Sequence, residues 1–227
     1  MGIETTIAEH MERRHVLAWG VADLTAARDY LAGVSEGYVV DLPRAISIAV
    51  PFPREIVDLL AEGPSRTYLY FYRQVNNRLN HIALEIDSIL SGEGYRSFPV
   101  PASRREGRER IGSIFPHRLA ANLAGIGWIG KSGLLIHPDV GPRLRLVTIL
   151  TDAPLETSSP VEDRCGSCTV CIEACPGGAI GERVDCEDWQ GNRLDAAMCD
   201  RYLTEVRDRH GVRVCGLCLA ACPWGKR

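Results

Sequence analysis

Hydrophobic residues form two kinds of pattern in the N-terminal part of this 227-residue chain: a helical spacing and a short continuous run. From Tyr72 to Leu90 the apolar positions lie three or four residues apart, which predicts an amphipathic helix. A short apolar run at 44–50 ends at Pro51 and predicts a buried strand. Alternation of such helices and strands is typical of an α/β layer domain, which we expect over residues 1–155.

The remaining elements of this part are shorter. The pattern predicts mostly helix over 1–37, short helices at 53–60 and 118–124, and strands at 95–100, 134–136 and 144–150. The mixed-charge run at 103–110 is typical of a solvated loop. Glu156 to Asp163, which contains Ser158-Ser159-Pro160, is the expected linker to a second domain at 156–227.

Composition narrows the class of protein. A hydrophobic content of 45% is ordinary for a globular chain with a core. The net charge of −3 gives no support for nucleic-acid binding. No apolar stretch approaches the roughly 20 residues that span a membrane, and no apolar signal segment follows Met1.

All nine cysteines lie in the last 63 residues, most of them in two runs. The first run has the spacing C-x2-C-x2-C-x3-C-P of bacterial ferredoxins, and the second is the shorter C-x2-C-x3-C-P. In two-cluster ferredoxins the Cys before the Pro binds the other cluster. This rule places Cys165, Cys168, Cys171 and Cys222 on one 4Fe–4S cluster, and Cys175, Cys215 and Cys218 on a second.

Spacing does not choose the fourth ligand of the second cluster, for which Cys186 and Cys199 both remain. Disulfides suit small secreted chains, and structural zinc explains neither Cys171 nor the two Cys-Pro tails. We therefore predict two iron–sulfur clusters and a cytoplasmic protein, since free thiolates need a reducing compartment.

A glycine-dense loop precedes the cysteines. Gly125, Gly127 and Gly130 give the letters of a dinucleotide-binding Gly-x-Gly-x-x-Gly. That site requires a strand before the glycines and a helix after them. Here a predicted helix precedes them and a predicted strand follows, so we exclude a Rossmann site.

Six motifs together resemble the epoxyqueuosine reductases. They are AGIGWIGK at 124–131, GPRLRL at 141–146, LTDAPL at 150–155, CGSCTVC at 165–171, DAAMCDRYLT at 195–204 and CPW at 222–224. They occur in the order found in that family, between about residues 118 and 224. Residues 1–110 match only in pattern.

The resemblance implies a nitroreductase-like α/β domain at 1–155 that binds cobalamin, followed by a ferredoxin-like domain with two 4Fe–4S clusters at 156–227. It implies reductive deoxygenation of epoxyqueuosine in tRNA through cob(I)alamin, with electrons from a low-potential ferredoxin or flavodoxin. It also makes Cys199 the fourth ligand of the second cluster. The cofactor-binding residues that it implies are Gly127, Trp128, Gly130, Lys131 and Tyr202.

The chain departs from the family in three ways. The general-acid Asp is missing from 111–118, where His117 is the titratable group able to donate a proton near neutral pH. The family's helical-repeat extension, which helps to hold tRNA, does not follow Trp224, and the net charge of −3 also disfavours tRNA. We therefore expect a different substrate. The alternative is a non-catalytic protein that reduces or handles corrinoid bound to a partner.

Overall fold

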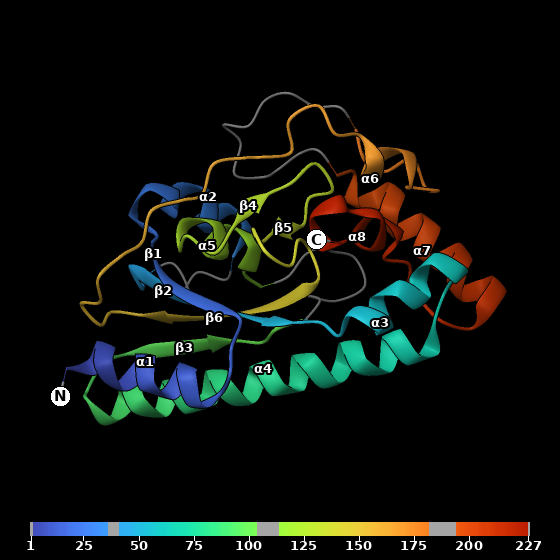
Figure 1. Cartoon of the computed structure of the whole chain (residues 1–227). Coiled ribbons are helices and arrows are strands. Elements are labelled where there is room, and N and C mark those ends of the chain that lie inside the picture. The colour runs from blue at the N-terminus through green and yellow to red at the C-terminus, as the bar shows by residue number, and fades with distance from the viewer. Residues whose placement is uncertain (1, 36–40, 104–113, 182–193, 227) are drawn as a thin grey trace. The chain divides into compact units, whose positions relative to one another are not determined.

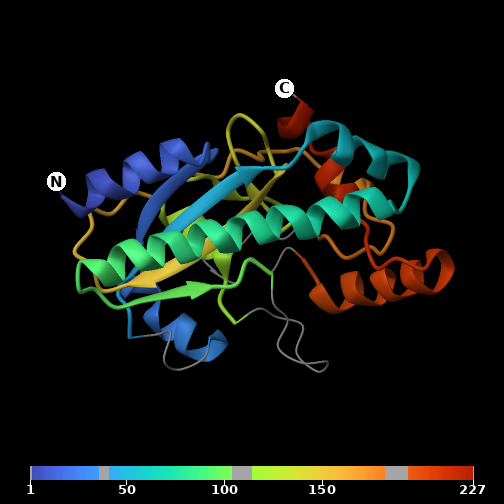
Figure 2. The same cartoon turned by 90° about the horizontal axis from the view of Figure 1, so that it is seen from below.

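The computed structural model describes residues 2–35, 41–103, 114–181 and 194–226 (Figures 1 and 2). Its contacts divide the chain into two units. We call Met1–Pro51, Val75–Gly127 and Arg145–Val161 the sheet unit. Phe52–Gln74, Trp128–Leu144 and Glu162–Arg227 form the cysteine unit. Each unit is therefore built from separate stretches of sequence.

A four-stranded sheet organises the sheet unit. Its strand order is β1 (Ala18–Asp23), β2 (Arg44–Pro51), β6 (Leu144–Thr151), β3 (Ser97–Val100). The helices α1 (Ile3–Arg13) and α4 (Arg66–Gly92) lie on one face, and α5 (His117–Leu123) lies on the other (Figures 1 and 2). Between β1 and β2, η1 (Thr25–Ala27) leads into α2 (Arg28–Val34).

Side-chain size differs between the two faces of the β1–β2 pair. Trp19 lies opposite Ile48 and Val21 opposite Ile46, and all four belong to or pack against the core beneath α1 and α4. The intervening pairs are small: Ala18 with Ala49, Gly20 with Ser47, and Ala22 with Ala45. The small face allows α5 to approach closely, and a Cβ on Gly20 would lie 2.2 Å from the carbonyl oxygen of Ala124.

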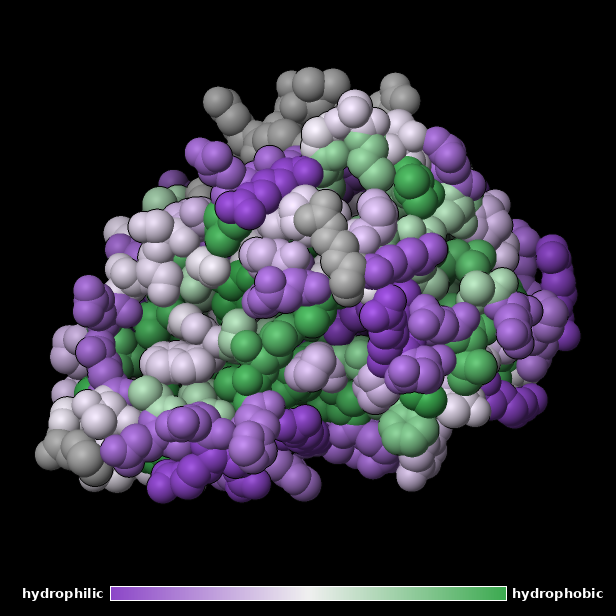
Figure 3. Space-filling model, in the orientation of Figure 1, coloured by the Kyte–Doolittle hydropathy of each residue, from purple (hydrophilic) through white to green (hydrophobic). Residues whose placement is uncertain are grey.

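The exposed sides of α1 and α4 are mostly polar, with Tyr70 and Leu84 on α4 as exceptions. Figure 3 shows hydrophilic side chains along the edge that these helices form. The buried positions include Ile7 and Met11 on α1 and Leu79, Ile86 and Leu90 on α4. Burial of these stripes against the sheet, more than helix propensity, stabilises the two helices.

The predicted strand at 44–50 and the predicted helices at 53–60, 72–90 and 118–124 are confirmed, with α4 longer than expected. The mainly helical prediction for 1–37 is wrong at 18–23, where β1 lies. Trp19 and Val21 alternate with small residues, and antiparallel pairing with β2 satisfies the backbone of this stretch. Most of the predicted loop at 103–110 lies outside the described residues.

The cysteine unit consists of short elements. They are α3 (Arg54–Asp58), η3 (Leu59–Glu62), the β4 (Trp128–Ile129) and β5 (Leu135–Ile136) hairpin, α6 (Val170–Glu173), α7 (Ala196–His210), α8 (Leu217–Ala221) and η4 (Pro223–Lys226). The helix α7 begins at Asp195, whose carboxylate accepts from the Met198 N–H at 2.9 Å, and ends at the left-handed Gly211.

Two observations bear on domain organisation. The expected linker at 156–163 contains no helix or strand. The segments 52–74 and 128–144 belong to the same compact unit as the cysteine-rich segment, whereas the boundary near residue 155 stays a prediction. Among the described helices, none combines the length and apolarity that crossing a membrane requires.

Candidate iron–sulfur centre

The first cysteine run is a tight turn followed by one helical turn. Gly166 adopts φ +53°, and the Cys168 N–H donates to the Cys165 carbonyl at 3.1 Å. The helix α6 then contains Cys171, and the Cys175 N–H donates to the Ile172 carbonyl at 3.1 Å. Consecutive turns of this kind present several thiols from one short stretch.

Four thiols gather in the first group that the spacing predicts. Burial raises the pKa of Cys171 to about 11, and the negative charges of Cys165, Cys222 and Cys168 add to that effect. Like charges raise a thiol pKa only at short range, so these four side chains are neighbours. Cys222, from the second run, thus joins the three leading cysteines of the first run.

The second group forms around Cys218. Burial raises the pKa of Cys218 to about 12. The negative charges of Cys215, Cys175 and Cys199 raise it further, as does that of Cys171 from the first group. The neighbourhood therefore includes Cys199, which the resemblance names as the fourth ligand. Cys186 lies outside the described residues.

The donor chemistry fits iron–sulfur clusters. None of the eight described cysteines forms a disulfide, and all eight are half-buried. Binding to iron deprotonates a thiol outright, so the raised pKa values describe the sites without metal. In the described part of the chain, no three His, Cys, Asp or Glu side chains could hold a single metal ion. Two groups of four soft thiolates instead suit two polynuclear clusters.

The segment that carries Cys222 is fixed by the turn at 141–143. Gly141 adopts φ +59°, and a Cβ there would lie 2.4 Å from the Gly225 nitrogen. The Arg143 guanidinium is buried and donates to the Asp58 carboxylate at 2.7 Å and to the Arg54 carbonyl at 3.2 Å. Hydrogen bonding to Arg143 lowers the pKa of Asp58.

The glycine loop contacts the first group. The indole N–H of Trp128 donates to the Cys165 sulfur at 3.4 Å, and the Trp128 side chain is 1% exposed. The Lys131 ammonium donates to the Cys168 carbonyl at 3.0 Å. A Cβ on Gly130 would lie 3.2 Å from the Cys165 sulfur. The loop therefore packs directly against the first cysteine run.

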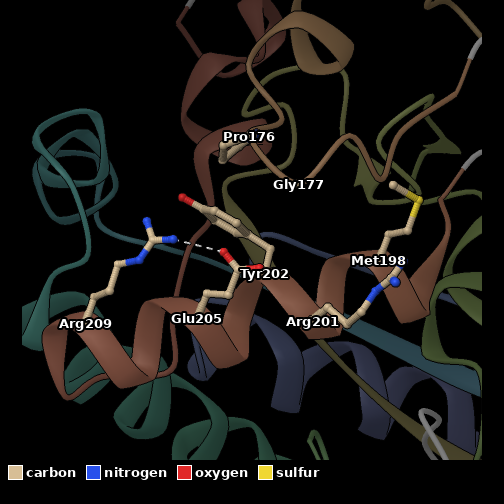
Figure 4. Close-up of a pocket in the computed structure, with 7 residues that line it drawn as sticks. All are labelled: Pro176, Gly177, Met198, Arg201, Tyr202, Glu205 and Arg209. Atoms are coloured by element: carbon tan, nitrogen blue, oxygen red, sulfur yellow. Dashed lines mark hydrogen bonds and ion pairs between the residues drawn. The ribbon is translucent and has the colours of Figure 1, made fainter.

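Gly127 and Tyr202 are the other two residues that the resemblance implies in cofactor binding. The Gly127 carbonyl belongs to the sheet unit and accepts from the Asn122 amide at 2.9 Å. Tyr202 lies in a pocket of about 570 Å³ in the cysteine unit. Figure 4 shows its ring between the loop at Pro176 and the Glu205–Arg209 ion pair. Burial and then the Cys215 charge raise the pKa of Tyr202. Cofactor binding by all five residues stays a prediction.

His117 begins α5 in the sheet unit. Its Nδ1 lies 2.8 Å from the Thr148 hydroxyl and its Nε2 lies 3.0 Å from the Pro101 carbonyl. Since a carbonyl only accepts, Nε2 carries the proton and Nδ1 accepts from Thr148. Burial lowers the pKa of His117 to about 4. The ring is thus neutral at pH 7 with both nitrogens engaged, which disfavours the proton-donor role that remains a prediction.

The free energy of unfolding should depend on pH because His117 is neutral in the native state. Between pH 6.5 and about 4 the unfolded state binds a proton at His117 that the native state does not, so stability is lost as the pH falls through this window. The loss is expected to reach up to about 3 kcal/mol. His117→Gln should flatten the pH dependence of the unfolding free energy, measured anaerobically in urea at pH 7 and pH 5. The exposed His81, changed to Gln, is the control, and equal slopes in wild type and His117→Gln would contradict the assignment.

Sequence reasoning missed two contacts that shape the centre. One is the Arg143–Asp58 pair, and the other is the hydrogen bond from Trp128 to Cys165. Both 143 and 128 lie inside motifs that drew attention, but no local pattern points to Asp58. Its partner is 85 residues away along the chain.

Parts of this chain are similar to known proteins. Residues 164–225 match the family described as a 4Fe-4S double cluster binding domain. The epoxyqueuosine reductase of Bacillus anthracis is 32% identical over 192 residues, which cover 80% of this chain and 47% of that protein. The enzyme of Escherichia coli is 36% identical over 167 residues, covering 69% and 39%.

Solved structures show the same fold. A crystal structure of an epoxyqueuosine reductase with an epoxyqueuosine-modified tRNA stem loop matches 99% of this chain and 66% of its own, with a TM-score of 0.65 and 20% identity. A reductive dehalogenase structure, described in terms of B12-dependent dehalogenation, matches 93% of this chain and 30% of its own, with a TM-score of 0.72 and 19% identity.

These comparisons show a mixed α+β fold, where an α/β layer domain and a ferredoxin-like domain were expected, and a double-cluster domain in which the structure describes eight cysteines. The chain spans about half the length of the curated relatives that it matches. Taken with the ordered motifs, they show that the chain belongs to the epoxyqueuosine reductase-like family and carries a 4Fe–4S double cluster domain.

Proposed function

We propose that this protein is a cobalamin-binding iron–sulfur oxidoreductase of the epoxyqueuosine reductase type; the net charge of −3 and the missing general-acid Asp favour a substrate other than tRNA. The observation that carries the proposal is the gathering of eight thiols into two groups of four in a chain related to those enzymes. A nitroreductase-like N-terminal part would hold the corrinoid, and the protein would work in the cytoplasm.

The clusters are the better supported half of the proposal. Thiolate-bound clusters carry single electrons at potentials that the protein tunes. Electrons would come from a low-potential donor of the ferredoxin or flavodoxin type. A bound cobalamin would supply the strongly reducing cobalt chemistry that removes oxygen from an epoxide.

The residues predicted to bind cobalamin differ in whether their polar side-chain atoms already have partners. Trp128 and Lys131 use their polar atoms on Cys165 and Cys168. Tyr202 keeps its hydroxyl without a hydrogen-bond partner among the described residues, and it faces a pocket (Figure 4). A corrin would therefore meet the glycine loop through its backbone, for which residues without Cβ atoms are suited. The expectation of cobalamin rests on the family and on the B12-dependent dehalogenase of the same fold.

Anaerobic purification with cobalamin tests the proposal. We expect about eight iron atoms per chain, four for each cluster, together with a retained corrinoid that gives a Co(II) paramagnetic signal. Full iron content without any corrinoid would overturn the cobalamin part. A preparation with fewer than two clusters, although all eight cysteines are intact, would overturn the redox part.

A second function is favoured by the absence of the general-acid Asp from 111–118. In it the chain transfers electrons to corrinoid bound by a partner protein and has no substrate of its own. This version predicts cluster-dependent reduction of a corrinoid protein without epoxide turnover. Queuosine synthesis in a strain that relies on this gene alone would contradict it, and would also restore tRNA as the substrate.

A further inference from the structure

The two cysteine groups receive different sets of hydrogen bonds. In the first group, Cys165 accepts from the Trp128 indole N–H at 3.4 Å and from the Lys131 backbone N–H. Cys222 accepts from the backbone N–H groups of Trp224 and Gly225. The glycine loop thus adds donors to those that the cysteine runs provide for themselves.

A positive charge accompanies these donors. The Lys131 ammonium is held 3.0 Å from the Cys168 carbonyl, within the same first group. An opposing charge comes from Asp163, which is exposed and accepts from the Cys165 N–H at 2.7 Å. Solvent screens an exposed carboxylate more than a half-buried ammonium, so Asp163 offsets only part of the effect of the Lys131 charge.

In the second group, the sulfurs of Cys215 and Cys175 accept hydrogen bonds from backbone N–H groups. Cys215 accepts from the N–H groups of Leu217 and Gly216, and Cys175 accepts from the Ala179 N–H at 3.4 Å. The donors to these two sulfurs are therefore backbone groups, whereas Cys165 of the first group also receives the Trp128 indole N–H.

Reduction adds negative charge to a cluster, so hydrogen bonds to its sulfurs and nearby cations raise its potential, and burial lowers it. We propose that the glycine loop makes the cluster of Cys165, Cys168, Cys171 and Cys222 the higher-potential member of the pair. Trp128 and Lys131 act as positioning residues that tune this cluster without binding iron. An electron given to the second cluster by the low-potential donor then passes to the first, which is reduced as the second is reoxidised.

This inference deepens the proposed function, because it orders the two clusters. The test is an anaerobic redox titration followed by electron paramagnetic resonance. Cys168→Ser and Cys218→Ser, each of which changes a ligand of one cluster, identify the two signals. Wild type should show two one-electron midpoints, the higher one belonging to the first cluster. Trp128→Phe should lower that midpoint alone, changing its oxidised-to-reduced ratio about tenfold at a fixed potential, or about 59 mV.

Matched variants separate tuning from packing. Trp224 packs edge-to-face on Trp128 with ring centroids 4.8 Å apart, so Trp224→Phe disturbs the same aromatic pair and keeps the indole bond to Cys165. It should leave the midpoint nearly unchanged. Lys131→Met should lower the same midpoint, and Lys131→Arg should restore it.

Equal midpoints, a higher midpoint on the second cluster, or equal shifts in Trp128→Phe and Trp224→Phe would each overturn the tuning role while leaving the two-cluster protein intact. A wild-type preparation without two clusters would instead overturn the proposed function.

Discussion

Replacing Cys199 by alanine is expected to cost the protein about four of its roughly eight iron atoms per chain. The thiol lies close enough to Cys218 for its charge to raise the pKa of that group, beside Cys215 and Cys175. Without Cys199 the second cluster would keep three thiolates of four, whereas the first would keep all its ligands. Iron analysis and the paramagnetic signal of each reduced cluster would measure the loss.

Cys186→Ala is the matched control, because 186 is the other cysteine that spacing left open. We expect it to retain the full iron content and both paramagnetic signals. The reverse result, with iron lost in Cys186→Ala and kept in Cys199→Ala, would contradict the ligand set of the second cluster. It would leave the first group of cysteines untouched.

Gly141→Ala is expected to destabilise the protein by about 3 kcal/mol and to loosen the first cluster. Gly141 needs a left-handed backbone at φ +59°, and its added Cβ would meet the Gly225 nitrogen at 2.4 Å. The obstacle is backbone, which cannot rotate away as a side chain would. Since 225 follows Cys222 closely, the movement should reach that ligand.

Gly94→Ala separates the cost of a left-handed backbone from the cost of the steric clash. Gly94 also has a positive φ, +84°, but nothing lies within 4 Å of its added Cβ. It should therefore show only the left-handed penalty of about 1 kcal/mol. Chemical denaturation and iron content would be measured for both variants under anaerobic conditions. Equal losses of stability, or full retention of the first cluster in Gly141→Ala, would contradict close packing at this turn.

Local pattern was sufficient where one period governed a long stretch. The amphipathic helix at 72–90 and the buried strand at 44–50 follow from residue spacing, and both occur. The strand at 18–23 does not follow, because its apolar run also suits a helix. Pairing with β2, which begins more than twenty residues later, decided it.

The cysteines likewise show what residue spacing can and cannot determine. Their spacing determined that this chain carries two clusters, because three thiols on one short turn have few other uses. Spacing could not choose between Cys186 and Cys199, since neither belongs to a run. Cys199 lies in the first turn of α7, and its position beside Cys218 depends on packing within the cysteine unit.

The sequence by itself determined the chemistry: a double-cluster iron–sulfur protein of the epoxyqueuosine reductase-like family, identified by thiol spacing and ordered motifs. Only the tertiary structure decided which groups contact the cysteines, His117 and the segment that carries Cys222. It brought the Trp128 indole to Cys165, Asp58 to Arg143, and both nitrogens of His117 to partners that keep it neutral. Hydrogen bonds and burial act over a few ångströms in space, whatever the distance along the chain, so no local pattern could reveal them.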